Sequence, residues 1–124
     1  MSTTATDALR LIDQHLQIWN MPDDKARKEL MQQTYSEDIW IIDPGTELHG
    51  YKAVSGFVND LQLNHPGFEF TVDRESEVHH DTGILYWLYG RPERPDEITG
   101  NDVFCFHGGK ICLMHVYING STGQ

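Results

Sequence analysis

The period of the hydrophobic pattern changes near residue 67, which limits the folds that the chain can adopt. Before this point, apolar residues recur every three or four positions, as in a helix with one buried face. After it, apolar and polar residues alternate, as in a strand with one wet face. The pattern predicts helices over 6–19, 23–35 and 51–63 and strands over 38–43, 68–73, 84–89, 101–107 and 111–118. This order indicates an α+β fold, with three N-terminal helices on one face of a curved, mainly antiparallel sheet.

Length and charge restrict the kinds of partner. The chain has 124 residues, enough for a single domain over 1–124 and too few for two. Asp and Glu number 19 against 9 Lys and Arg, a formal charge of -10, which disfavours nucleic acid and anionic membranes. No segment has the length of an apolar transmembrane helix, and the first residues lack the pattern of a secretory signal. We therefore expect a cytoplasmic protein with no nucleic-acid or membrane partner.

The cysteines and histidines do not have the spacing of metal ligands. Cys105 and Cys112 are not part of a CxxC pair, and in the cytoplasm both thiols are expected to be reduced. The adjacent His79 and His80 would point to opposite faces of a strand, and no HExxH motif is present. The sequence thus predicts neither a metal nor a cofactor.

An acidic residue ends the first predicted strand. The run IWII at 39–42 favours a strand that is buried on both faces, and Asp43 and Pro44 end it. Burying a carboxylate costs free energy unless something compensates for it. Asp43 either caps the turn that follows, as Asp often does before Pro and Gly, or points into a cavity as a general base.

One histidine borders the apolar face of the first predicted helix. His15 follows Ile12 by three positions and precedes Trp19 by four, which is helical spacing. It is either a hydrogen-bonded core histidine or a donor or base that lines a cavity. Both interpretations are open at this point.

Three segments together resemble one superfamily. YSEDIWIIDPGTELHG at 35–50, YKAVSGFVNDL at 51–61 and NDVFCFHGGKICLMHVY at 101–117 are similar to the nuclear transport factor 2-like superfamily. It includes ketosteroid isomerases, SnoaL-type polyketide cyclases, scytalone dehydratase and limonene epoxide hydrolase. The resemblance extends over residues 8–118 and implies a cystatin-like cone with an apolar pocket, and a homodimer that packs through the outer sheet face. It does not identify the activity, because this superfold carries many chemistries.

The motif is most similar to that of the ketosteroid isomerases. Tyr35, Asp38, Asp43 and Pro44 fit the family pattern Tyr-x-x-Asp-x-x-x-x-Asp-Pro, whose last Asp is a general base that moves a proton beside a carbonyl. By the same resemblance, Asp102 has the position of an aspartic acid that stays protonated and donates a hydrogen bond to the oxyanion. The resemblance thus implies one base and one acidic donor.

The sequence departs from its relatives at several positions. His15 lies near the place of the ketosteroid isomerases' oxyanion tyrosine, and Val58 replaces a supporting tyrosine. Gly100 stands where limonene epoxide hydrolase has the Arg of its Asp-Arg-Asp set. The strand at 84–90 lacks the histidine that SnoaL-type cyclases pair with the position of Asp102. These departures argue against steroid isomerisation as the specific reaction.

Strand alternation places Asp102 in an apolar setting. It shares a face with Phe104 and Phe106, where a carboxylate loses hydration. Two carboxylates in one apolar pocket can take separate roles, one ionised as a base and one protonated as a donor. The catalytic candidates are therefore Asp43, Asp102 and His15. The expected substrate-binding residues are Trp19, Phe57, Val58, Leu61, Trp87, Phe104, Met114 and Val116.

The leading functional hypothesis is an isomerase, cyclase or dehydratase that needs no cofactor. Such an enzyme would abstract a proton from an apolar, carbonyl-bearing small molecule in the pocket of the cone. One alternative is a non-catalytic module of the same fold that binds a hydrophobic ligand or a protein partner. Another is a histidine-based dehydratase that uses His15 with His79 or His80.

The register of the final hairpin decides which residues share the pocket with Asp102. A two-residue loop at 108–109 would place Asp102 opposite His115. A three-residue loop at 107–109 would place it opposite Met114. We predict the three-residue loop, which is similar to the superfamily's usual x-Gly-Lys turn.

This register has consequences for the last strand, because a slip of one residue would reverse every side chain. It puts Met114 and Val116 on the pocket face and His115 outside the site. It also directs Cys105 and Cys112 to opposite faces, so that they could not form a disulfide.

Overall fold

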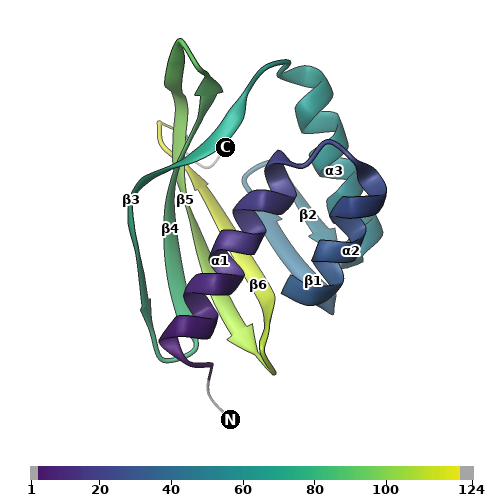
Figure 1. Ribbon diagram of the computed structural model, residues 1–124, viewed down its shortest axis with the longest axis vertical. Helices are drawn as coiled ribbons and strands as arrows, with labels where there is room; N and C mark the ends of the chain where they lie inside the picture. The colour runs from purple at the N-terminus through teal and green to yellow at the C-terminus, as the bar shows by residue number, and fades with distance from the viewer. Residues whose placement is uncertain (1–2, 121–124) are drawn as a thin grey trace.

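Helices and strands follow one another in the predicted order (Figure 1). In the computed structural model, which describes residues 3–120, three helices cover one face of a six-stranded sheet. The helices are α1 (Ala5–Asn20), α2 (Asp24–Thr34) and α3 (Gly50–Asn64). The strands are β1 (Tyr35–Asp43), β2 (Thr46–His49), β3 (Glu69–His79), β4 (Thr82–Arg91), β5 (Arg94–His107) and β6 (Lys110–Ile118). The prediction of an α+β fold with helices on a curved, mainly antiparallel sheet is confirmed.

Strand β6 lies inside the sheet although it comes last in the described chain. The strand order is β2-β1-β6-β5-β4-β3. Strands β1 and β6 run parallel, and every other pair of neighbours is antiparallel. A parallel pair cannot be joined by a tight turn, so the chain makes the rest of the sheet before it returns to β1.

Helix α1 carries its apolar residues and one histidine on the face toward the sheet. Thr4 caps its first turn, with Oγ1 accepting a hydrogen bond from the Asp7 backbone N–H at 3.1 Å. Leu11 and Ile18 are fully buried, and His15 is on the same face with 2% of its surface exposed. Helical spacing thus places an imidazole inside the molecule.

Strand β1 is buried on one face only, which corrects the expectation from its apolar run. Ile39 and Ile41 have no exposed surface, whereas Trp40 is 39% exposed. Trp40 stacks on His49 and donates its indole N–H to Glu47 Oε1 at 3.0 Å. The reason is that the helices cover only one side of the sheet, so that the side chains of β1 alternate between core and surface.

Two segments form strands that the hydrophobic pattern does not predict. Residues 46–49 form β2, which pairs with β1 in a tight hairpin. Residues 90–100 lie almost entirely in β4 and β5, whose hairpin projects at the top of Figure 1. Their side chains are mostly polar and exposed, and ladder hydrogen bonds rather than apolar burial hold this hairpin.

The final hairpin has a two-residue loop, so the prediction of a three-residue loop is wrong. Gly108 and Gly109 both have positive φ, 59° and 77°, which glycine adopts without strain. His107 pairs with Lys110, but the register shifts between Cys105 and Phe106. A bulge in β6 therefore adds one residue close to the turn.

Because of the bulge, the side chains of β6 beyond it point to the same faces as the predicted three-residue loop would have given. Asp102 pairs with Val116, and Phe104 with Met114. Met114 and Val116 accordingly face the helices, and Tyr117 is on the outer face with 57% exposure. His115 lies beside Tyr117, with ring centroids 6.4 Å apart.

The two cysteines are neighbours in β5 and β6, and the expectation that they point to opposite faces stays a prediction. The Cys112 thiol donates to the Cys105 carbonyl oxygen at 3.4 Å, and both thiols are free. The physical reason is the bulge, which leaves Cys112 without a partner of its own beside the Cys105–Leu113 pair. Burial raises the pKa of the Cys112 thiol, so the thiol form is favoured.

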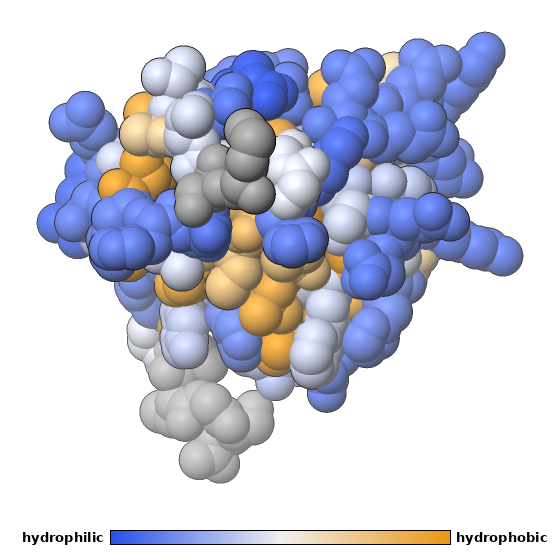
Figure 2. All heavy atoms as spheres, turned by 90° about the horizontal axis from the view of Figure 1, so that it is seen from below, coloured by the Kyte–Doolittle hydropathy of each residue, from blue (hydrophilic) through white to orange (hydrophobic). Residues whose placement is uncertain are grey.

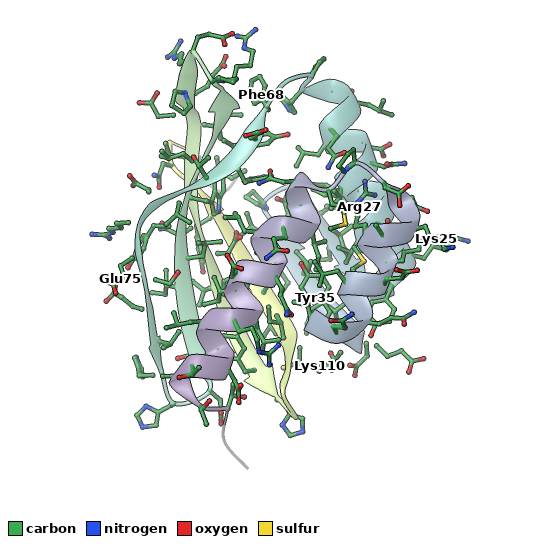
Figure 3. All side chains as sticks on the ribbon, in the orientation of Figure 1. Lys25, Arg27, Tyr35, Phe68, Glu75 and Lys110 are labelled. Carbon is green, nitrogen blue, oxygen red and sulfur yellow. The ribbon has the colours of Figure 1, made fainter. Side chains whose placement is uncertain are left out.

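A buried arginine joins the helices to one another. Arg27 has no exposed surface (Figure 3). Its guanidinium donates to the carbonyl oxygen of Met21 at 2.9 Å and to Ser55 Oγ at 3.1 Å. It also lies 3.6 Å from Asp24 Oδ1. These bonds tie the α1–α2 connection to α3 and so hold α3 over the sheet.

Candidate functional site

An apolar cavity lies between the helices and the concave face of the sheet. Its volume is about 210 Å³. Helices α1 and α3 form one wall, and the inward side chains of β4, β5 and β6 form the other. The lining residues are His15, Leu16, Trp19, Asp43, Phe57, Leu61, His65, Phe70, Trp87, Tyr89, Ile98, Asp102, Met114, Val116 and Ile118. The few polar groups among them are the candidates for chemistry.

Asp43 and Asp102 line this same cavity. Asp43 is the last residue of β1, is half-buried, and accepts a hydrogen bond from the Gly45 backbone N–H at 3.1 Å. Burial raises the pKa of Asp43, and the nearby charge of Asp102 adds to this effect. The Gly45 hydrogen bond opposes it. Asp43 is therefore both the turn cap and the cavity carboxylate that the sequence offered as alternatives.

Asp102 is bound by two N–H groups. It projects from β5 with 6% of its surface exposed. Trp87 Nε1 lies 3.0 Å from Oδ1, and His15 Nε2 lies 3.0 Å from Oδ2. Gly100 makes room for the Trp87 indole, because a methyl group there would lie 2.4 Å from its ring. Both oxygens of this carboxylate are thus engaged as acceptors.

His15 is part of a chain of buried hydrogen bonds. Trp19 Nε1 donates to the Tyr35 hydroxyl oxygen at 3.0 Å, and that oxygen lies 2.5 Å from His15 Nδ1. Tyr35 has no exposed surface, and burial raises its pKa, so its hydroxyl keeps its proton (Figure 3).

The donors and acceptors fix where the imidazole proton lies. Among residues 3–120, the Tyr35 hydroxyl has no acceptor other than His15 Nδ1. If Nδ1 accepts, the imidazole carries its proton on Nε2 and donates it to Asp102. Protons are thus donated in one direction, from Trp19 through Tyr35 and His15 to Asp102. Every member of the chain then has a partner.

Most of the expected pocket residues line the cavity. These are Trp19, Phe57, Leu61, Trp87, Met114 and Val116, together with Asp43, Asp102 and His15. Val58 and Phe104 do not; both have no exposed surface and belong to the core. Phe104 packs its ring against that of His15, with centroids 5.1 Å apart. These two side chains stand behind the wall of the cavity rather than on it.

The adjacent histidines of the β3–β4 turn do not line the cavity. His79 and His80 are exposed at the β3–β4 turn, and their Nδ1 atoms lie 3.0 Å apart. The scheme that combines either of them with His15 therefore does not fit the geometry. Within residues 3–120, no three His, Cys, Asp or Glu side chains are arranged to hold a metal ion.

Several cavity residues were not expected from the sequence. Tyr89 lies on the inward side of β4, two positions after Trp87, so strand alternation alone could have identified it. His65 follows α3 in a His-Pro-Gly sequence that signals only the end of a helix. The contact of Tyr35 with His15 joins a strand to a helix and has no sequence signal.

The profile of the SnoaL-like domain matches residues 12–114 of the chain. No curated protein matches the sequence. None of the helices in the described part of the chain combines the length and the hydropathy needed to span a membrane.

Solved structures of similar proteins share the fold. A proposed isomerase of the SnoaL-like family from Agrobacterium tumefaciens is 22% identical, with a TM-score of 0.85 over 93% of this chain and 99% of that one. A proposed polyketide cyclase from Sinorhizobium meliloti is 17% identical, with a TM-score of 0.69 over 92% of this chain and 99% of that one. A proposed ketosteroid isomerase from Kribbella flavida is 14% identical, with a TM-score of 0.71 over 94% of this chain and 80% of that one.

Proposed function

Because the chain belongs to the SnoaL-like family, and because Asp43 and Asp102 line one apolar cavity, we propose that it is an isomerase- or cyclase-type enzyme. It acts without a cofactor and abstracts a proton from the carbon beside a carbonyl group of a small, apolar molecule. The observation that carries this proposal is that two carboxylates with unequal hydrogen bonding share one cavity.

Asp43 is the base in this proposal. Among the described residues, its single hydrogen bond comes from the Gly45 backbone, so one oxygen remains open to the cavity. Its raised pKa lets it take a proton from the substrate and return it to another carbon of the same molecule. A positioned base of this kind contributes about 10²–10⁴-fold to the rate.

Asp102 is a hydrogen-bond acceptor in this proposal and is not the acidic donor that the resemblance implies. Both of its oxygens accept N–H groups, from His15 and Trp87, so neither is left to donate to an oxyanion. Its charge raises the pKa of Asp43 and so makes Asp43 the stronger base, while the substrate keeps the negative charge as an enolate until Asp43 returns the proton. His15 is then a positioning residue that fixes the Asp102 carboxylate.

The size of the cavity limits the substrate. At about 210 Å³ it is somewhat larger than an engineered cavity of about 150 Å³ that binds benzene. One or two fused rings therefore fit within it, whereas a four-ring steroid would extend beyond it. The proposed substrate class is a ketone of one or two rings.

Deuterium exchange at the α-carbon tests this function. The ketone 1-tetralone, incubated with the protein in D₂O, is expected to gain deuterium faster than in buffer, as NMR would measure. Asp43→Asn should abolish the enhancement, and Asp38→Asn, an exposed residue of the same strand, should preserve it. A ketone that binds without exchange would indicate the non-catalytic binding module instead. Exchange lost in His15→Ala but retained in Asp43→Asn would favour histidine-based chemistry.

A further inference from the structure

The end of the cavity away from the carboxylates also has polar side chains, Tyr89 and the neighbouring His65. Tyr89 is 3% exposed and lines the cavity. No hydrogen bond to its hydroxyl is present within residues 3–120, and burial alone raises its pKa to about 12. The Tyr89 hydroxyl is therefore open to a partner from outside the protein, and such a hydroxyl is usually satisfied by water or a ligand.

The ring that carries this hydroxyl is held firmly. Tyr89 stacks on Phe70 with ring centroids 4.0 Å apart and an interplanar angle of 21°. Phe68, labelled in Figure 3, packs at 5.1 Å, and the His65 ring packs at 5.7 Å. Three aromatic contacts leave the phenol little freedom to turn toward another partner. The hydroxyl is thus preorganised rather than mobile.

Strand pairing sets the distance between the two polar ends. Leu85 pairs with Asp102, and Tyr89 pairs with Ile98, further along the same two strands. Four residues of an extended strand cover roughly 13 Å. Trp87, between Leu85 and Tyr89 on the inward face, provides an apolar floor. A ligand in the cavity therefore meets carboxylates at one end, an apolar middle, and a phenol at the other.

We propose that the Tyr89 hydroxyl binds an oxygen substituent at the far end of the ligand, so that the cavity selects ring compounds with oxygen functions at opposite ends. The ligand class is a two-ring ketone that carries a second hydroxyl or carbonyl group on the ring remote from the first. This proposal concerns binding, so it does not depend on whether Asp43 abstracts a proton.

A pair of ketones that differ by one hydroxyl group tests it. 6-Hydroxy-1-tetralone has the remote hydroxyl, and 1-tetralone lacks it. Binding is measured by quenching of the tryptophan fluorescence, since Trp19 and Trp87 line the cavity. The hydroxylated ketone is expected to bind about five- to tenfold more tightly, as one neutral hydrogen bond provides. Tyr89→Phe should remove this preference, so that the two ketones bind the variant with equal dissociation constants.

The matched control is Tyr86→Phe. Tyr86 is on the same strand but its hydroxyl bonds to Glu77 outside the cavity, so this variant should retain the preference. Thermal unfolding of both variants checks that each is folded. Equal binding of the two ketones by the unmodified protein, no binding of the hydroxylated ketone, or a preference that survives in Tyr89→Phe would each overturn the proposal. Deuterium exchange is a separate readout, so failure of the proposed chemistry remains distinguishable.

Discussion

The two carboxylates of the cavity differ in how many hydrogen bonds they accept. Asp102 accepts one from each of two side chains, whereas the described partner of Asp43 is a single backbone N–H. The same residue type thus has two environments within one cavity. Such a difference gives the two acids separate roles, and it leaves Asp43 as the one that is free to transfer a proton.

The raised pKa of Asp43 predicts how stability depends on pH. The unfolded chain releases this proton near the ordinary pKa of 3.8, and the folded chain releases it at higher pH. The contribution of Asp43 to stability is therefore fully present below pH 3.8 and is lost as the pH rises through the folded pKa. Asp43→Asn should be more stable than the unmodified protein at pH 7, and the difference should shrink toward pH 4. Urea unfolding across this range measures it, with Asp38→Asn as the control, and a difference independent of pH would contradict it.

The buried chain of hydrogen bonds predicts non-additive mutations. His15→Phe leaves the proton of the Tyr35 hydroxyl without an acceptor and one Asp102 oxygen without a donor, which should cost about 2–3 kcal/mol. Tyr35→Phe removes the same hydrogen bond, because it deletes the hydroxyl that lies against His15 Nδ1. The double variant should lose less stability than the sum of the two single variants, by at least about 0.5 kcal/mol. Urea unfolding of the four proteins gives this coupling, and strictly additive costs would argue against the bond.

Strands β4 and β5 show how one small residue positions the site. A methyl group on Gly100 would lie 2.4 Å from the Trp87 ring and 2.3 Å from the Tyr117 carbonyl oxygen. Neither the central strands nor a buried indole can move this far without loss of packing. The hydrogen bond between Trp87 and Asp102 therefore depends on a glycine in the neighbouring strand.

Gly100→Ala should accordingly lower stability by about 3 kcal/mol and shift the Trp87 fluorescence as the indole leaves Asp102. Gly56→Ala on α3 is the matched control, because nothing lies within 4 Å of the added methyl group. It should instead raise stability by about 0.5–1 kcal/mol, since alanine is the better helix former. Thermal unfolding and emission spectra measure both, and similar effects of the two substitutions would refute this role of Gly100.

Local pattern predicts the elements that bury many apolar side chains. The three helices and most strands follow from their periods, and Asp43 and Asp102 from the resemblance. Strand β2 does not, because its four residues bury only Leu48. The bulge at Cys112 has no sequence signal, since glycines in the turn permit either loop. The contacts of His15 depend on how a helix crosses a sheet, which periodicity does not specify.

The sheet as a whole has one covered face and one open face. Tyr117 is exposed on the open face. Figure 2, a view from below rather than onto this face, shows hydrophobic residues at the surface among mainly hydrophilic ones. We propose, as the superfamily resemblance implies, that a second copy of the chain covers this face. Sedimentation at micromolar concentration should then show a dimer, and Tyr117→Glu should give a monomer. Leu63→Glu, at an exposed residue of α3, should leave the dimer intact. A monomeric unmodified protein would contradict the proposal.

The central position of β6 also governs when the molecule can fold. Ile41 pairs with Met114, so most of the chain lies between these two partners. During synthesis, β1 and β5 exist for seconds with no strand to join them, because ribosomes add about 5–20 residues per second. The cavity lacks the wall formed by Met114 and Val116 throughout that time. A nascent chain therefore cannot join the two parts of its sheet until residues 110–118 emerge, so the order of synthesis makes the wall of the cavity among the last parts to form.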